Sequence, residues 1–507
     1  MTVKKIILHG KEDFSKIVGE VLRSLKVKEV ADNDTADVDD LEITNEIIGR
    51  KVITRIKFTA YGEENSSVET SIINLKERYG AEVNRLVKRN LYLLILDAFG
   101  LEPVPYGILH GVRPTKIVQR WIDEGFGVTR QGVADRGKIS RRIAEDFLTD
   151  IDKASLLTEV SVSQLPIIRT GGKKIVSVYI GIPFCKTRCL YCSFPSFVLP
   201  KENKVAEFMT TLTKDIEAAA EEIKRYGFRV QTIYIGGGTP TALPEQFFAE
   251  MLEKVSDKFN GAGVEEFTVE CGRPDTITAE KIAALKKFGV TRVSVNPQTM
   301  HQRTLDFIGR CHTVEDVTRA FNELRSAGDW KINMDLIIGL PGERLADFQE
   351  TLTKVLELAP DDVTIHSLAI KRGSKLQMNL ADDINRPEDF DLPEDEEVRA
   401  MADYAAKILR GKNYLPYYLY RQGYMSGQIE NIGWCRRGAE SIYNVQIMSE
   451  RQTIIGVGAA ASSKVPDNFA RKLLTAFNAK DLTTYLRDID KYIANRSNIL
   501  AQVYLPK

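Results

Sequence analysis

A chain of 507 residues is long enough for two to four domains, and its 43% hydrophobic content is ordinary for a globular protein. Seventy basic and seventy acidic residues cancel, which excludes a global electrostatic attraction to nucleic acid or to a membrane surface. The apolar run near the N-terminus is too short for a secretory signal, and the richest apolar segment, 91–100, is far shorter than a membrane span. We therefore expect a cytoplasmic protein that binds no nucleic acid and has no membrane span.

Residues 1–170 are expected to form a separate α+β domain whose role the sequence does not reveal. This part begins with a βα-like pattern and ends in helices, and the apolar segment at 91–100 predicts a buried helix. The polar stretch RTGGKK, which starts at Arg169, marks the boundary with the next part of the chain.

Six short runs rich in Val and Ile lie between residues 171 and 375, and such runs are typical of strands buried on both faces. They are IVSVYIGI from Ile175, QTIYIGG from Gln231, EFTVECG from Glu266, RVSVNPQ from Arg292, KINMDLIIGLP from Lys331 and DVTIHSLAI from Asp362. Amphipathic stretches separate them, including helices predicted after Pro244 and between the N-cap Thr313 and Gly328. The alternation predicts parallel βαβ units in an open, partial (β/α)6 barrel, with its chemistry at the C-terminal strand ends.

Residues 376–507 are expected to form a mixed C-terminal region that covers the substrate. A charged, proline-bearing connection leads into a predicted helix within 396–414. A tyrosine-rich stretch at 414–427 could line a flat aromatic ligand, but a core role is at least as well supported. Just before this region, Lys371 and Arg372 are candidates for binding substrate carboxylates at the barrel rim, and a solvated role is equally expected.

Three of the six cysteines, Cys185, Cys189 and Cys192, follow the first predicted barrel strand with the spacing C-x3-C-x2-C. Thiolates are soft ligands that suit iron–sulfur clusters and zinc. A structural zinc site usually has four ligands, often as two separated pairs, but no second pair lies nearby and no histidine lies between these cysteines. The pattern predicts a metal site with one open position, and three ordinary buried thiols are the less favoured alternative. The isolated thiols are interpreted as packing residues: Cys271, Cys311 and Cys435.

The spacing of the three cysteines directly after a strand resembles the radical S-adenosylmethionine (SAM) superfamily. This resemblance implies a [4Fe–4S] cluster on Cys185, Cys189 and Cys192, with SAM bound at the fourth iron. It also implies that an electron from the cluster cleaves SAM to methionine and a 5′-deoxyadenosyl radical, which abstracts a hydrogen atom from the substrate. An electron donor such as flavodoxin or ferredoxin is then an expected partner.

Longer motifs resemble the oxygen-independent coproporphyrinogen III oxidase (HemN-like) family. They are YIGIPFCKTRCLYC, GGGTPT, RVSVNPQTM, IGRCHT, NMDLIIGLPGE and IIGVGAAASSKV. Two more stretches, LHGVRPTKIV and ECGRPDTIT, resemble the HemZ-type branch of that family. The resemblance implies a tetrapyrrole substrate and the oxidative decarboxylation of two propionates of coproporphyrinogen III, which yields protoporphyrinogen IX.

The same resemblance implies a set of SAM contacts at the ends of the barrel strands. The glycine loop after the second strand would hold the methionine part of SAM, Arg310 can fork onto its carboxylate, and Asp335 suits the ribose hydroxyls. The implied contacts are Tyr179, Gly236, Gly237, Gly238, Thr239, Glu270, Gln298, Arg310, Asp335 and Ala369. Structural roles remain as alternatives, such as a turn cap for Glu270 and a satisfied core amide for Gln298.

One position departs from the decarboxylating oxidases of this family. Those enzymes carry a further cysteine one residue after the third, where this chain has Phe194, and in this respect the chain is similar to the haem-binding chaperone branch. The cluster needs only three thiolates, so Phe194 does not affect cluster binding. The difference instead bears on whether a second SAM binds and whether both propionates are decarboxylated. Two alternatives therefore stay open, a haem-binding transfer protein without turnover and a radical enzyme that opens or alkylates haem.

Overall fold

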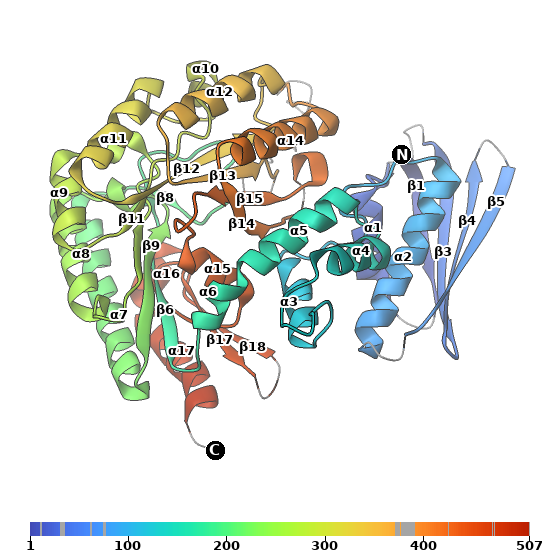
Figure 1. Cartoon of the computed structure of the whole chain (residues 1–507), viewed down its shortest axis with the longest axis horizontal. Coiled ribbons are helices and arrows are strands. Elements are labelled where there is room, and N and C mark those ends of the chain that lie inside the picture. The colour runs from blue at the N-terminus through green and yellow to red at the C-terminus, as the bar shows by residue number, and fades with distance from the viewer. Residues whose placement is uncertain are drawn as a thin grey trace. The chain divides into compact units, whose positions relative to one another are not determined.

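The structure is a computed structural model that describes residues 1–10, 13–30, 36–60, 63–74, 78–370, 376, 391–423, 425–468, 470 and 472–505. The chain divides into two compact units, Met1–Glu159 and Val160–Lys507 (Figure 1). The division falls within helix α5 (Ile151–Ser163). The rim candidates Lys371 and Arg372 lie outside the described residues.

The first unit is an α+β fold on a five-stranded sheet of order β2-β1-β3-β4-β5. Its strands are β1 (Thr2–His9), β2 (Lys28–Glu29), β3 (Val38–Ile48), β4 (Lys51–Ala60) and β5 (Glu63–Ile72). β1 pairs parallel with β2 and β3, whereas β3, β4 and β5 form an antiparallel meander.

Five helices complete this unit: α1 (Ser15–Ser24), α2 (Tyr79–Phe99), α3 (Thr115–Asp123), α4 (Arg136–Phe147) and most of α5. Helix α2 confirms the buried helix predicted around 91–100, because Leu91, Leu94 and Ile95 lie in the core beside the sheet. The helix ends at Gly100, whose left-handed conformation suits glycine at this position.

The second unit contains an eleven-stranded sheet of order β14-β15-β13-β12-β11-β10-β9-β6-β16-β17-β18. The six predicted strands are present: β6 (Ile175–Ile182), β9 (Arg229–Gly237), β10 (Glu266–Val269), β11 (Arg292–Ser294), β12 (Lys331–Ile338) and β13 (Asp362–Ser367). They pair parallel in chain order. Within the described residues the pairing does not close on itself, which agrees with the predicted partial barrel.

Strands from the C-terminal region extend both edges of this sheet. β16 (Thr453–Gly458) pairs parallel with β6 and so adds a seventh parallel strand that the sequence interpretation did not include. The antiparallel additions are β14 (Leu415–Tyr420), β15 (Asn431–Cys435), β17 (Ser462–Asp467) and β18 (Lys472–Phe477). The C-terminal region therefore contributes strands to the barrel sheet, and residues 415–420 of the tyrosine-rich stretch form strand β14.

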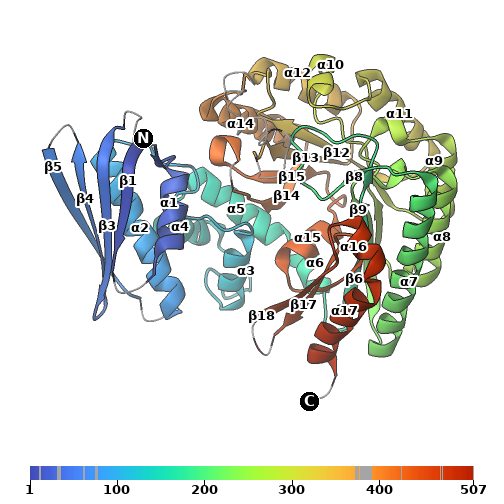
Figure 2. The same cartoon turned by 180° about the vertical axis from the view of Figure 1, so that it is seen from behind.

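Helices cover the outer side of the curved sheet (Figures 1 and 2). They are α7 (Glu202–Tyr226), α8 (Glu245–Phe259), α9 (Ala279–Lys287), α10 (Gln302–Phe307), α11 (Val314–Ala327) and α12 (Leu345–Glu357). Helix α11 begins as predicted, because the Thr313 side chain accepts from the Asp316 amide in a capping box. Among the described residues, the unit also has helices α6 (Leu165–Thr170), α14 (Asp395–Gly411), α15 (Ile442–Ser449), α16 (Leu482–Arg487) and α17 (Ile489–Tyr504). None of the described helices has both the length and the apolar character that crossing a membrane requires.

A buried ion network, which we call the Arg496 network, joins α17 to α7 and β16. Arg496 Nε donates to Glu222 at 2.6 Å, and its Nη1 donates to Asp215 at 2.6 Å. The second Asp215 oxygen accepts from the Gly458 amide at 2.9 Å and from the Tyr485 hydroxyl at 3.0 Å. Every group named here is hydrogen-bonded, as expected where charges are buried for structural reasons.

Candidate functional site

The three clustered cysteines lie on one loop at the C-terminal end of β6. The loop runs between two short strands, β7 (Phe184–Cys185) and β8 (Phe197–Val198), which pair in parallel. The Leu190 amide donates to the Ile308 carbonyl at 2.9 Å, and the Thr187 hydroxyl donates to the Gly309 carbonyl at 3.0 Å. The loop is therefore held against the turn that precedes Arg310.

The described side chains do not form a ready-made metal-binding group of three or more His, Cys, Asp or Glu residues. The three thiols nevertheless influence one another. Burial raises the pKa of Cys192, and negative charge on Cys189 and Cys185 raises it further. Thiolates on one loop repel one another unless a cation neutralises them, so this donor set fits an iron–sulfur cluster.

Cys189 lies in a positively charged environment. Burial alone raises the pKa of its thiol, but the charges of Arg310 and Arg273 outweigh burial and hold that pKa below its usual value. Nη1 of Arg273 donates to the Cys189 sulfur at 3.0 Å. Because the thiolate is the form that binds metal, this environment favours the ligating state of Cys189.

The predicted glycine loop lies at the end of β9, directly beside the cysteine loop. The Thr239 hydroxyl donates to the Cys185 sulfur at 3.6 Å. A Cβ on Gly238 would lie 2.5 Å from the Phe184 carbonyl oxygen, and a Cβ on Gly236 would lie 2.6 Å from the Glu270 carboxyl carbon. The backbone contact requires glycine at position 238, whereas a side chain at position 236 would displace the Glu270 carboxylate.

Glu270 points toward this glycine loop from the end of β10. Its carboxylate accepts from the Tyr234 hydroxyl at 2.6 Å and from the Gly237 amide at 3.1 Å. Burial raises the pKa of Glu270 to about 7, and the nearby charge of Asp335 acts in the same direction, although the two hydrogen bonds partly oppose the shift. Glu270 therefore lies where a cationic ligand would stabilise its charged form.

Three stacked tyrosines lie next to Glu270. The ring centroids of Tyr234 and Tyr443 are 4.4 Å apart, and the Tyr179 ring lies 6.1 Å from Tyr234 and 6.2 Å from Tyr443. A Cβ on Gly237 would lie 3.2 Å from the Tyr179 hydroxyl, so Tyr179 also reaches the glycine loop. The sequence interpretation included Tyr179 but missed Tyr234 and Tyr443.

Gln298 has a left-handed backbone conformation, with φ of 71°, which is rare for a residue with a side chain. Its amide donates to the Asp335 carbonyl at 3.0 Å, which fixes it beside β12. The Gln298 side-chain oxygen is buried and accepts no hydrogen bond within the described part of the chain. A strained backbone with an orphaned buried acceptor is typical of a ligand-binding position.

Asp335 projects from β12, and its carboxylate accepts from the Asn333 amide group at 2.7 Å. Its other oxygen lies 3.7 Å from His366 Nε2. Burial raises the pKa of Asp335, but the bonds to His366 and its neighbours outweigh burial and leave that pKa below its ordinary value. Ala369, the last predicted contact, follows β13 and bridges to Met425.

Arg310 is almost fully buried, and its guanidinium already has several partners. Nη1 donates to the carbonyls of Gly272 at 3.0 Å and Asn296 at 2.7 Å, while Nη2 donates to the Tyr191 hydroxyl at 3.2 Å. Nε is buried without a hydrogen-bond partner in the described structure. Nε–H is thus a donor of Arg310 that an added carboxylate could use.

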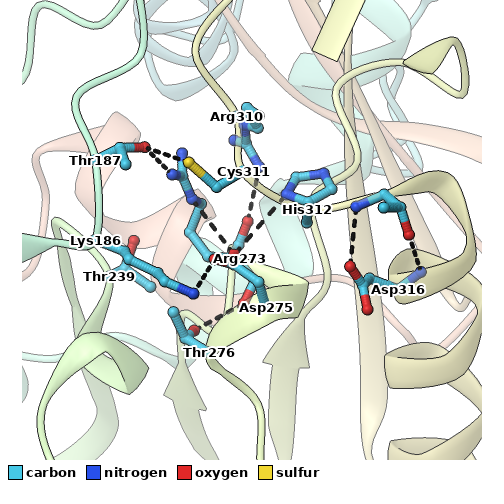
Figure 3. Close-up of polar contacts among 12 residues, drawn as sticks. Lys186, Thr187, Thr239, Arg273, Asp275, Thr276, Arg310, Cys311, His312 and Asp316 are labelled. Carbon is cyan, nitrogen blue, oxygen red and sulfur yellow. Dashed lines mark hydrogen bonds and ion pairs between the residues drawn. The ribbon is translucent and has the colours of Figure 1, made fainter. Parts of the chain in front are cut away.

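Arg310, which the sequence interpretation included, lies in a group of ionisable residues beside Cys189, and that interpretation missed the other members as part of the site. We call this group the rim charges: Lys186, Arg273, Asp275, Arg310 and His312. Figure 3 shows Lys186, Arg273 and His312 converging on Asp275, at 2.9, 3.8 and 4.0 Å. The signal available in the sequence was the Arg-Pro-Asp triplet directly after a strand end.

One earlier interpretation needs correction here. Cys311 is exposed, so it is not a packing thiol, whereas Cys271 and Cys435 are buried as expected. His312, next to Cys311, is buried, and neither ring nitrogen has a hydrogen-bond partner among the described residues. Burial and the charges of Arg310 and Arg273 lower the pKa of His312 to about 3, so its ring is neutral.

Comparison with known proteins places this site in a family. The radical SAM superfamily profile matches residues 179–355. The chain is 35% identical over 456 residues to the oxygen-independent coproporphyrinogen-III oxidase-like protein HemZ of Bacillus subtilis, covering 89% of this chain and 87% of that protein. The chain belongs to the HemZ family. Members of the radical SAM superfamily use a [4Fe–4S] cluster and SAM as cofactors.

Two further known proteins are similar to parts of this chain. The haem chaperone HemW of Bacillus subtilis is 35% identical over 201 residues, which cover 38% of this chain and 51% of HemW. The solved structure of coproporphyrinogen III oxidase HemN from Escherichia coli matches with a TM-score of 0.52 at 20% identity, covering 67% of this chain and 78% of HemN. The HemN match supports the partial-barrel fold.

Proposed function

We propose that this protein catalyses the oxygen-independent oxidative decarboxylation of coproporphyrinogen III to protoporphyrinogen IX. The observation that carries the proposal is the similarity to HemZ, a protein named oxidase-like, which extends over 89% of the chain. The Bacillus subtilis chaperone HemW aligns with only 38% of it. The proposal also assigns a tetrapyrrole as the substrate and a protein such as flavodoxin or ferredoxin as the electron donor.

In this proposal, Cys185, Cys189 and Cys192 hold the [4Fe–4S] cluster and the strand ends hold SAM. When bound and reduced, these cofactors supply a 5′-deoxyadenosyl radical that removes a hydrogen atom from a propionate side chain. The three cysteines fit a cluster because their thiolates repel one another unless a cation neutralises them. The strand ends fit SAM because the buried side-chain oxygen of Gln298 has no hydrogen-bond partner among the described residues.

The remaining predicted contacts would orient SAM. Gly236, Gly237, Gly238 and Thr239 would let the methionine part approach the backbone closely. Glu270 would accept hydrogen bonds from SAM in its charged form, because the positive charge of SAM lowers the pKa that burial has raised.

Four further residues would complete the SAM pocket. Asp335 would bind the ribose hydroxyls, and Arg310 would use its free Nε–H for the SAM carboxylate. Tyr179 would cover the ligand from the side of β6, and Ala369 would offer its backbone to the adenine.

A second candidate function is haem binding and transfer, and Phe194 favours it. Phe194 is 62% exposed and lies on the cysteine loop, where the oxidases of the family carry a further cysteine. Phe197 and Val198, on the same loop, are also exposed. Neighbouring exposed apolar side chains suit contact with a flat macrocycle, with or without turnover.

Anaerobic incubation of the reconstituted protein with SAM, a reductant and coproporphyrinogen III tests the proposal. We expect protoporphyrinogen IX, carbon dioxide, methionine and 5′-deoxyadenosine, measured by mass spectrometry. Formation of 5′-deoxyadenosine only when haem replaces coproporphyrinogen would indicate a radical enzyme acting on haem. Stoichiometric haem binding with no 5′-deoxyadenosine above background would refute the enzyme and favour the carrier.

A further inference from the structure

Arg273 directly contacts one of the three cluster cysteines. It follows β10 and is 3% exposed, and its Nη1 donates to the Cys189 sulfur at 3.0 Å. A hydrogen bond from a charged donor is shorter and stronger than one between neutral groups. The bond therefore places a permanent positive charge beside a thiolate.

Two neighbours hold the Arg273 guanidinium in this position. Nη2 donates to the Thr187 hydroxyl, which is itself fixed by its bond to the Gly309 carbonyl. On the other side, Nε lies 3.8 Å from the Asp275 carboxylate (Figure 3). Arg273 is thus anchored to the cysteine loop by Thr187 and to its own loop by Asp275.

A purely structural role does not account for the way this arginine is paired. Nε of Arg273 and Oδ1 of Asp275 lie 3.8 Å apart, and both are buried without hydrogen-bond geometry to any described group. The other Asp275 oxygen pairs with Lys186 at 2.9 Å and not with the arginine. Unsatisfied buried polar groups of this kind are costly. The arrangement instead optimises one contact, the hydrogen bond to the Cys189 sulfur.

We propose that Arg273 is a positioning residue that raises the reduction potential of the [4Fe–4S] cluster through its charged hydrogen bond to Cys189. Adding an electron makes the cluster and its thiolates more negative, so a fixed cation beside a ligating sulfur stabilises the reduced state more than the oxidised state. Hydrogen bonds to the sulfurs and local charge are among the factors that set iron–sulfur potentials. The inference depends on the cofactors of the family and not on the identity of the substrate.

Arg310 also lies near Cys189, but its pairing differs. Its Nη1 donates to two backbone carbonyls and its Nη2 to the Tyr191 hydroxyl. Arg310 thus fixes three loops together, whereas Arg273 directs Nη1 at the sulfur. The charge of Arg310 also acts on Cys189. We therefore assign to Arg273 the part of the tuning that comes from its hydrogen bond to the sulfur.

The test is a redox titration of the reconstituted full-length protein with dithionite under anaerobic conditions, followed by electron paramagnetic resonance. Arg273→Gln removes the positive charge, and Arg273→Lys keeps the charge but cannot donate to Cys189 and Thr187 from two guanidinium nitrogens. Thr187→Val removes the uncharged hydroxyl that accepts from Arg273 Nη2. Arg325→Gln is the control, because Arg325 is an arginine of the same unit that pairs with Asp361 and the Trp330 carbonyl.

At a fixed potential, we expect Arg273→Gln to lower the ratio of reduced to oxidised cluster about tenfold, which for a one-electron couple is about 59 mV. Arg273→Lys and Thr187→Val should lower it less, and Arg325→Gln should not change it. Full iron content with an unchanged midpoint in Arg273→Gln would overturn the proposal. If that variant binds no iron, the other two decide: lowered midpoints support the proposal and wild-type midpoints overturn it.

Discussion

Two buried arginines of the second unit show how differently a folded chain can treat the same charge. Arg496 donates to Asp215, Glu222 and the Gly456 carbonyl, at 2.6, 2.6 and 3.0 Å. Arg273 donates to a cysteine sulfur and a threonine hydroxyl, and its Nε has no hydrogen-bond partner in the described structure.

The contrast extends to the neighbours of each arginine. In the Arg496 network, the Asp215 carboxylate accepts from backbone, amide and hydroxyl donors. Among the rim charges, Asp275 Oδ2 pairs with Lys186 at 2.9 Å, but Asp275 Oδ1 and both ring nitrogens of His312 are buried without hydrogen bonds to described groups. Incomplete pairing also occurs at Arg292 Nε and Asp362 Oδ1, which are buried without hydrogen-bond partners among the described residues. Among the rim charges it indicates a ligand site only together with the contact to Cys189.

Removing a cluster thiol should have the largest effect, because it takes away one of the three cluster ligands. This variant tests whether the rim charges adjoin a metal site at all. Cys189→Ala should reduce iron from about four atoms per chain to near zero after anaerobic reconstitution. Iron and sulfide assays measure this loss. Cys435→Ala, a buried thiol on β15, should keep its iron. Full iron in Cys189→Ala, or zinc in the wild-type protein, would contradict the assignment.

The two arginines should also differ in their contribution to stability. Arg496→Met leaves Asp215 and Glu222 buried without their cation, so we expect a loss of about 3–5 kcal/mol in the free energy of unfolding. Arg273→Met should cost clearly less, because several of its neighbours are already unpaired. Urea unfolding of the apoprotein compares the two variants. Equal losses would show that Arg273 is as structural as Arg496.

The sequence predicted the regular part of this architecture well. Dense Val and Ile runs identified all six central strands, and Thr313 marked the start of α11. Strand β16 was not predicted as part of the barrel, because it comes some 90 residues after β13 in the chain and only pairing with β6 reveals its place. Side-chain pairing was harder still. The contact between Arg273 and Cys189 joins residues 84 positions apart, and no periodic pattern encodes it.

Glu270 is a buried acid that is hydrogen-bonded to the Tyr234 hydroxyl and the Gly237 amide, and its titration gives a further test. Its pKa is about 7 in the folded chain, above the ordinary value of 4.5, so the folded state binds a proton that the unfolded state has lost. Stability from this group is therefore lost as the pH rises from about 4.5 to 7, by about 3 kcal/mol in all. Glu270→Gln cannot titrate, so its stability should not show this loss.

The measurement is urea unfolding of both apoproteins across this pH range, without SAM, whose positive charge would lower the pKa again. Asp362, whose pKa burial also raises to about 7, is present in both proteins and cancels in the difference. A constant difference between wild type and Glu270→Gln across the range would show that Glu270 is already charged in the folded apoprotein.

The last test concerns Arg310, which shares features with both arginines of the comparison. Its Nη1 is satisfied by two carbonyls, as in a structural arginine, whereas its Nε is buried and unpaired. If Nε binds the SAM carboxylate, Arg310→Ala should weaken SAM binding by about 1.5–3 kcal/mol, the value of a hydrogen bond to a charged group. Arg310→Lys keeps the charge but loses the fork, so its loss should be smaller.

Isothermal titration with SAM gives the affinity, and iron content shows whether the cysteine loop is intact in each variant. Arg325→Ala, on α11, serves as the control and should bind SAM like the wild type. Lower SAM affinity with full iron would place Arg310 with the incompletely paired groups that await a ligand. Unchanged affinity together with reduced stability would place Arg310 with Arg496 instead, because its bonds to Gly272, Asn296 and Tyr191 would then account for its conformation.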